Sequence, residues 1–243
     1  MIRGPEGTEV VLGLRRGDET FDLPLERSRI EISAVTYKID SSEDERRVGY
    51  IRLKTFNARA AREMREATKT LEDGNVEGYV LDLRGNPGGL LEASIDIARQ
   101  WLNEGIIVST KTQDGISDVR RATGSALTEK PLVVLIDQGS ASASEIIAGA
   151  FQDNGRAELV GQKTYGKGLV QAMRALSDGS GLTVTVAKYL TPNGTDIHKH
   201  GIEPDVKSEI SKKQLEKFKI ENLGTKEDSQ YVAAKKLLFK NLY

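Results

Sequence analysis

The sequence contains no cysteine among its 243 residues, which excludes disulfide bonds, cysteine-ligated zinc, iron–sulfur clusters and thiol catalysis. No apolar run approaches the roughly 20 residues that span a bilayer. The longest such run, residues 132–136, has the length of a buried strand. Neither sign of charge is in excess, since 35 lysines and arginines stand against 36 acidic residues. Nucleic acid is therefore not an expected partner, because backbone phosphates require a basic excess or stripe.

Apolar residues make up 38% of the chain and charged residues 29%, which is typical of a soluble globular protein. At about 100–200 residues per domain, the length predicts one full domain and a fragment. The first seven residues lack the apolar core of a signal peptide. The sequence therefore predicts either a protein that stays where it is made or a chain that begins after its targeting segment.

The fragment is expected at the N-terminus, where residues 8–14 and 20–25 alternate between apolar and polar side chains and are joined through residues 16–18. This pattern predicts a β-hairpin. A lone hairpin is marginally stable, so we expect residues 1–28 to be the last piece of a small domain. Residues 29–243 then form the main domain and its tail, which we expect to be helical from residue 207 onward.

From residue 48 onward, strand-like and helix-like segments alternate, which is the pattern of a layered α/β domain. Helices are indicated by apolar residues at helical spacing, and strands by short apolar runs. The expected strands lie at residues 50–53, 78–83, 132–136 and 182–187, and the expected helices at 57–73, 91–102, 143–152 and 231–239.

Several familiar catalytic motifs are absent. The sequence has no Gly-x-Ser-x-Gly, Ser-x-x-Lys or His-Glu-x-x-His motif. The only histidines, His198 and His200, lie two residues apart in an expected loop, and we interpret them as solvated imidazoles. We expect no metal site and no cofactor.

Residues 161–168 nearly match a phosphate-binding P-loop, but Gly168 stands where the motif needs serine or threonine for magnesium. Residues 169–173 also fit a strand at least as well as a helix. Nucleotide binding is therefore disfavoured, although glycines on both sides of Lys167 indicate that the backbone packs closely there.

Ser142 lies between a buried strand and a helix, among small residues. Together with Glu145 it forms a capping-box pattern, and a helix cap is the ordinary interpretation of such a serine. A second interpretation is catalytic, because the free amides at a helix N-terminus can hold an oxyanion. The glycine-rich turn at residues 85–89 could supply a second donor.

Six motifs, in order, resemble those of the carboxyl-terminal processing proteases, which are tail-specific serine–lysine proteases, and in particular a photosynthetic-type member lacking most of its PDZ domain. The motifs are Leu-Asp-Leu-Arg-Gly-Asn-Pro-Gly-Gly (81–89), Gly-Ser-Ala-Ser-Ala-Ser-Glu-Ile (139–146), Asp-Asn-Gly-Arg-Ala (153–157), Gly-Gln-Lys-Thr-Tyr-Gly-Lys-Gly (161–168), Tyr-Leu-Thr-Pro-Asn-Gly (189–194) and Gly-Ile-Glu-Pro-Asp (201–205). The resemblance implies a ClpP/crotonase-like layered α/β core of repeated β-β-α units, preceded by the β-hairpin remnant of a PDZ domain.

The resemblance also assigns roles to residues. Ser142 would be the nucleophile, Lys167 the general base and Gln171 the residue that orients the lysine. The backbone amides of Gly88 and Ala143 would form the oxyanion hole. No cofactor is implied.

A lysine can act as a base only when it is neutral, yet an exposed lysine titrates near 10.4. Lowering that pKa to about 7–8 costs the charged form ~4 kcal/mol, and burial away from carboxylates can do so. We therefore expect Lys167 to lie in a tightly packed, dry pocket. Gln171 could bond the neutral amine without adding charge.

The expected function is a serine endopeptidase that cleaves near the C-termini of protein or peptide substrates with apolar ends, membrane-associated proteins among them, through an acyl-enzyme. By resemblance, its compartment would be the periplasm or the thylakoid lumen. Two alternatives stay open: a non-catalytic ligand-binding module on the same fold, and a truncated, inactive protease core.

Overall fold

The computed structural model describes residues 2–28, 33–41, 46–209 and 220–240. The chain divides into two units, Met1–Ser33 and Ala34–Tyr243. In the first unit, β1 (Glu9–Arg16) pairs antiparallel with β2 (Glu19–Glu26), which confirms the predicted hairpin. The division predicted after residue 28 falls beside residues 29–32, which lie outside the described residues. The origin of this hairpin in a PDZ domain stays a prediction.

The second unit is built on a six-stranded sheet in the order β12-β9-β8-β5-β4-β3. All neighbouring strands run parallel except β3, which is antiparallel to β4 at one edge. The strands are β3 (Val35–Asp40), β4 (Val48–Leu53), β5 (Gly78–Asp82), β8 (Leu132–Ile136), β9 (Glu158–Gly161) and β12 (Val206–Lys207).

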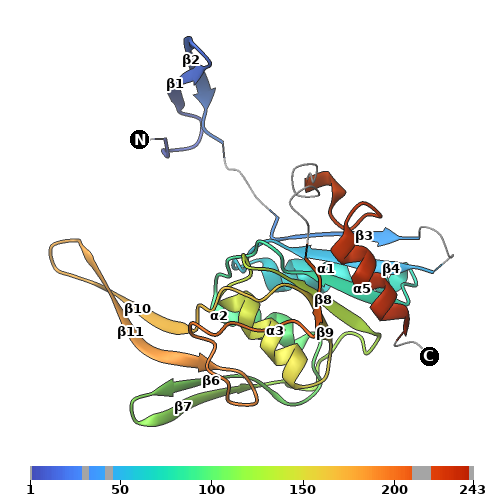
Figure 1. Ribbon diagram of the computed structural model, residues 1–243. Coiled ribbons are helices and arrows are strands. Elements are labelled where there is room, and N and C mark those ends of the chain that lie inside the picture. Colours follow the sequence, from blue (N-terminus) through green and yellow to red (C-terminus); the bar gives the residue numbers. More distant parts are fainter. Residues whose placement is uncertain (1, 29–32, 42–45, 210–219, 241–243) are drawn as a thin grey trace. The chain divides into compact units, whose positions relative to one another are not determined.

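Helices cover both faces of this sheet (Figure 1). On one face, the core contains Leu81 and Val134 together with side chains of α1 (Ala60–Asp73), α2 (Leu91–Arg99) and α3 (Ala143–Asp153). On the other face, the alternate strand residues meet α5 (Ser229–Lys240) in a second, smaller core, whose members include Val80, Val133, Tyr231 and Leu238. Buried strands with apolar side chains on both faces explain the continuous apolar runs in the sequence.

A second, four-stranded antiparallel sheet has the order β10-β11-β6-β7. Its strands are β6 (Ile106–Thr112), β7 (Gly115–Arg121), β10 (Leu169–Ala175) and β11 (Gly181–Leu190). The long β10–β11 hairpin projects from the body of this unit (Figure 1). Its pairing with β6 is short, since only Lys188–Leu190 take part among the described residues.

The layered α/β class is confirmed, and so is the hairpin ahead of the core. The P-loop alternative is wrong, because Gly168 is followed by strand β10 and not by a helix N-terminus. The last predicted helix is confirmed as α5, and a short 3₁₀ helix (Ile220–Asn222) precedes it. The tail begins as strand β12 instead of helix, and residues 210–219 lie outside the described residues. Within the described ranges, none of the helices has the length and apolar character needed to cross a membrane.

Candidate active site

Two loops meet where β5 and β8 end, at the carboxyl edge of the parallel strands. The Asn86 carbonyl accepts hydrogen bonds from the Ala141 amide (3.0 Å) and the Ser144 hydroxyl (2.9 Å). The Gly85 amide donates to the Asp137 carboxylate (2.8 Å). The glycine-rich turn and the serine segment, far apart in sequence, are therefore held together, at the edge where open α/β sheets bind ligands.

Ser142 has a strained backbone conformation, with φ 57° and ψ −113°. A non-glycine residue rarely adopts such a positive φ, and the strain costs on the order of 1–3 kcal/mol. The residue follows β8 and directly precedes Ala143, the first residue of α3. This sharp strand-to-helix turn has the local geometry that presents a nucleophilic serine at the end of a sheet.

Glu145 joins the serine segment to the lysine segment. This carboxylate is fully buried and accepts the Ser142 amide (2.8 Å) and the Lys167 amide (2.8 Å) on the same oxygen, Oε2. Its other oxygen, Oε1, accepts the Gly166 amide (2.6 Å) and the Thr164 hydroxyl (2.5 Å). The backbones of Ser142 and Lys167 are thus neighbours. The sequence presented Glu145 only as part of a capping box, so this role was missed.

Gly88 lies directly against the serine turn. Its φ is +100°, and a Cβ atom built there would lie 2.7 Å from the Ala141 carbonyl oxygen and 2.8 Å from Ser142 Cβ. Its amide donates to the side-chain oxygen of Asn86 at 2.9 Å, so the donor predicted for an oxyanion hole already has an acceptor. Ala143 is buried, and its amide belongs to the first helical turn, where no intrahelical acceptor exists.

Lys167 and Gln171 are both exposed, and the dry pocket expected around Lys167 is not present. The close packing inferred from the flanking glycines belongs to the backbone. A Cβ atom on Gly166 would meet Lys199 and the Gly201 amide, and one on Gly168 would overlap the His198 backbone. The chain is therefore tightly held on both sides of the lysine while its amine stays accessible to solvent.

The two histidines differ in their surroundings. His200 is exposed, with Nδ1 3.2 Å from the Asp196 carbonyl oxygen. His198 is half-buried, and its Nδ1 is buried without a hydrogen-bond partner among the described residues. The interpretation as a solvated imidazole therefore fits His200 and is wrong for His198, which lies against Gly168.

Arg84 connects the glycine-rich turn to the C-terminal helix. Its buried guanidinium donates to Asp82 (2.6 Å) and to Asp228 (2.6 Å), and it also bonds the side chain of Gln230 (2.9 Å). Burial opposes ionisation of Asp228, but the Arg84 hydrogen bonds and charge outweigh it and hold the pKa of Asp228 below its usual value. Sequence reasoning missed this network, although two charged residues at the end of a buried strand are a signal for one.

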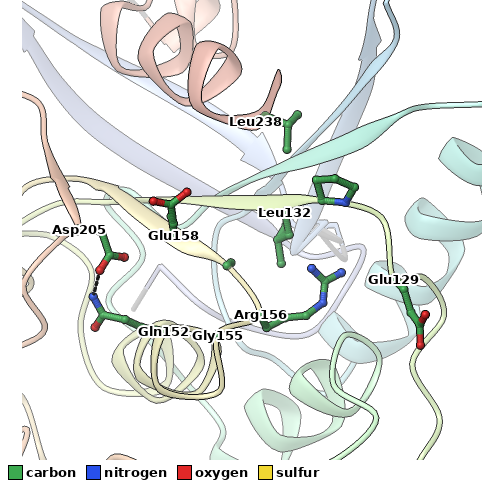
Figure 2. A pocket seen from close by; sticks show the side chains of 10 residues that line it. Glu129, Leu132, Gln152, Gly155, Arg156, Glu158, Asp205 and Leu238 are labelled. Atoms are coloured by element: carbon green, nitrogen blue, oxygen red, sulfur yellow. Dashed lines mark hydrogen bonds between the residues drawn. The ribbon is translucent and has the colours of Figure 1, made fainter. Parts of the chain in front are cut away.

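A separate cavity of about 480 Å³ lies between β8, the start of β9 and α5 (Figure 2). Its lining includes Leu132, Arg156 and Leu238 and none of the predicted catalytic residues. The Arg156 guanidinium donates to the backbone carbonyls of Trp101 (2.8 Å) and Lys130 (3.0 Å), and burial lowers its pKa. These hydrogen bonds hold the loops that contain Trp101 and Lys130.

Residues 47–208 match the sequence profile of Peptidase family S41. The chain is 50% identical to a carboxyl-terminal-processing protease of Synechocystis sp. over 98% of its own length and 55% of that protein. It is 47% identical to the chloroplastic carboxyl-terminal-processing peptidase 2 of Arabidopsis thaliana, over 84% of this chain and 41% of that one. The chain thus spans about half the length of these curated relatives.

Among solved structures, the fold resembles that of a photosystem II D1 C-terminal processing protease, with a TM-score of 0.70 and 38% identity. The match covers 85% of this chain and 57% of the other. The profile match extends over most of the second unit, including the serine turn, the glycine-rich turn and the lysine segment. The chain therefore belongs to peptidase family S41.

Proposed function

We propose that this chain is the catalytic core of a serine endopeptidase that cleaves proteins near their C-termini through Ser142 and Lys167. The observation that carries the proposal is the strained Ser142 at the start of α3, whose amide shares one carboxylate oxygen with the Lys167 amide. Strain of this kind persists where the surrounding structure enforces it, and it gathers at active sites.

In the proposed reaction, the Ser142 hydroxyl attacks the carbonyl carbon of the scissile peptide bond while its proton passes to the neutral Lys167 amine. The lysine then gives this proton to the leaving amine, and the acyl-enzyme forms. Water attacks the ester with the same amine as base, which restores the serine. Gln171 would orient the amine. Because Lys167 is exposed in the free chain, bound substrate has to displace the water around it.

The oxyanion would be held by the Ala143 amide at the helix N-terminus and by the Gly88 amide. The Gly88 amide donates to Asn86 in the free chain, so it must exchange that acceptor for the substrate oxygen. Such a bond formed only during the reaction contributes to the rate, not to ground-state binding.

The names of the relatives support protein substrates that are processed at the C-terminus, in one case photosystem II D1. For this chain we propose substrates with apolar C-terminal segments, membrane proteins among them. We propose the periplasm or the thylakoid lumen as its compartment, because the relatives include chloroplastic and cyanobacterial proteins.

The test is cleavage of a protein with an apolar C-terminal tail, followed by mass spectrometry of the products. Ser142→Ala should abolish cleavage, a loss of at least about 10³-fold for a nucleophile. Its melting temperature should stay within about a degree, because truncating Ser142 removes no core side chain. Equal cleavage by the variant and the parent chain would contradict the proposal.

Two observations keep one alternative under consideration, a ligand-binding module without catalysis: Lys167 is exposed, and the Gly88 amide already donates a hydrogen bond to Asn86. A serine-directed fluorophosphonate separates the two. Covalent labelling that Lys167→Met and Ser142→Ala both remove supports the enzyme. A chain that binds the tailed protein but takes up no label supports the binding module.

A further inference from the structure

A small cavity of about 210 Å³ lies between the edge of the six-stranded sheet and the segment that leads into α5. Strands β3 and β4 supply one wall, and the 3₁₀ helix together with the residue after it supplies the other. The lining residues used below are Thr36, Lys38, Tyr50, Arg52, Ile220 and Leu223. Among the described residues, this lining contains two cations and no carboxylate.

The strand register places both cations on the same face of the sheet. Lys38 is paired with Tyr50 across β3 and β4. Thr36 is paired with Arg52, and directly opposed residues share a face of a sheet. Tyr50 and Arg52 are two positions apart, so their side chains share this face as well. Tyr50 belongs to the smaller core, which identifies the face as the one that α5 covers.

Arg52 carries hydrogen-bond donors that the described part of the chain does not use. No residue there accepts a hydrogen bond from its guanidinium or forms an ion pair with it. Its Nε is buried without a partner, and a buried donor without an acceptor costs about 1–3 kcal/mol. A planar guanidinium with free donors is suited to an anion that presents several oxygens.

Lys38 is held at the same cavity by weaker contacts. Its ammonium nitrogen donates to the Leu223 carbonyl oxygen (3.1 Å) and lies 5.3 Å from the centre of the Tyr50 ring. It has no ion-pair partner within the described ranges. Because an ammonium group has three N–H donors, Lys38 keeps donors for a ligand.

The acidic residue beside Arg52 is already engaged. Asp82 is paired with Arg52 across β4 and β5, and its carboxylate accepts a hydrogen bond from the Arg84 guanidinium (2.6 Å). Arg84 is shared between Asp82 and Asp228. Counted together, these two carboxylates and the two guanidinium groups are neutral, which leaves the charge of Lys38 in excess. The excess positive charge favours an anionic ligand.

We propose that this cavity binds a phosphate group, held by the Arg52 guanidinium and the Lys38 ammonium, with the Thr36 hydroxyl as a further donor. A phosphate presents at least three strong acceptor oxygens to these three donor groups, whereas a carboxylate presents two. The volume is below the roughly 300–1,000 Å³ of pockets for drug-sized ligands, which suits a small group.

The phosphate has two possible sources, the free ion and the headgroup of an anionic lipid. Ile220 in the cavity lining is 80% exposed, so an apolar side chain is available beside the charged groups, as at membrane surfaces. Because neither Ser142 nor Lys167 lines this cavity, phosphate binding here is independent of the proposed function.

The first measurement is isothermal titration calorimetry of the whole chain with inorganic phosphate at constant ionic strength. We expect saturable binding that Lys38→Gln and Arg52→Gln each weaken about tenfold, the scale of one charge-assisted hydrogen bond. Lys38 is exposed, so its substitution keeps the test valid if Arg52→Gln disturbs the fold. Acetate should bind at least tenfold more weakly than phosphate.

The second measurement is cosedimentation with vesicles of phosphatidylglycerol and phosphatidylcholine, compared with vesicles of phosphatidylcholine alone. Binding to the anionic vesicles that both variants weaken, without binding of inorganic phosphate, would support the same site with a lipid as its source of phosphate. Saturable binding of inorganic phosphate that both variants weaken would support the free ion.

Matched controls lie on α1, which packs on the other face of the sheet. Lys69→Gln and Arg65→Gln remove one exposed lysine and one exposed arginine there, and both should leave binding unchanged. The proposed site is wrong if neither probe binds, or if the controls weaken binding as much as the variants in the cavity do. Equal binding of acetate and phosphate would overturn the assignment of the ligand.

Discussion

At the scale of single residues, Glu145 explains how two distant segments form one site. A buried carboxylate is costly unless it is hydrogen-bonded, and Glu145 meets this condition with three backbone amides and one hydroxyl. Because the amides of both Ser142 and Lys167 donate to the same oxygen, the backbone positions of the proposed nucleophile and the proposed base are set by one group.

Replacing this carboxylate with an amide tests that role. In Glu145→Gln, a donor group would face amides that need an acceptor, which should destabilise the fold by about 3 kcal/mol. We expect kcat to fall at least about 100-fold with a smaller change in KM, since the reacting groups lose alignment. Urea unfolding and steady-state kinetics measure the two effects. Glu104→Gln, at an exposed position, is the control, and an unchanged kcat in Glu145→Gln would refute the role.

Among the site residues, Ser142 could be proposed from its neighbours, because the strand before it and the small residues around it are local features. The exposure of Lys167 could not be predicted in this way. What packs beside Gly166 and Gly168 is the backbone of residues 198–201, about 30 positions later in the chain, and it covers the glycines instead of the amine. The sequence correctly indicated close packing around Lys167. The packed atoms, however, are those of the flanking glycines and not the lysine side chain.

At the scale of elements, the first turn of α5 is anchored to the loop after β5. Asp228 accepts the Tyr231 amide at the start of this helix (3.2 Å) and receives two hydrogen bonds from Arg84, which directly precedes the glycine-rich turn. The position of that turn, and of Gly88 in it, therefore depends on a helix more than 130 residues away in sequence.

The lowered pKa of Asp228 predicts how this anchor responds to acid. A depressed carboxylate pKa contributes stability that is complete above the unfolded-state value of about 3.9 and is lost as the pH falls through the folded-state value. Asp228→Asn should cost about 3 kcal/mol near neutral pH, because it breaks a buried pair. The difference in unfolding free energy between the parent chain and Asp228→Asn should shrink only below about pH 4. Chemical denaturation between pH 3 and 8 measures the unfolding free energy of both chains. If the difference between the parent chain and Asp228→Asn grew on acidification, the predicted direction of the pH dependence would be wrong.

Elements with strong local patterns could be predicted, and those that depend on partners could not. The apolar spacing of α1 and the stop at Gly74 were visible in the sequence. Strands β6 and β7 were missed, because they carry charged residues such as Lys111 and Arg120 and gain their strand conformation from pairing with each other. The pairing of β11 with β6 at only three positions likewise has no signal in the sequence.

At the scale of the second unit, the six-stranded sheet separates two cores of unequal size. The smaller core depends on α5, whose Leu238 is fully buried against the strands. Leu238→Ala should lower the free energy of unfolding by about 3 kcal/mol, through lost burial and the void left behind. Leu237→Ala, at a half-buried position on the same helix, should cost less, and differential scanning calorimetry compares them. An equal loss of unfolding free energy in the two variants would mean that burial of Leu238 does not stabilise the packing of α5.

The single oxygen of Glu145 that holds both segments also couples their movements. A ligand that pulls residues 164–167 out of place would shift the serine turn at the same time, so inhibition need not reach the hydroxyl at all.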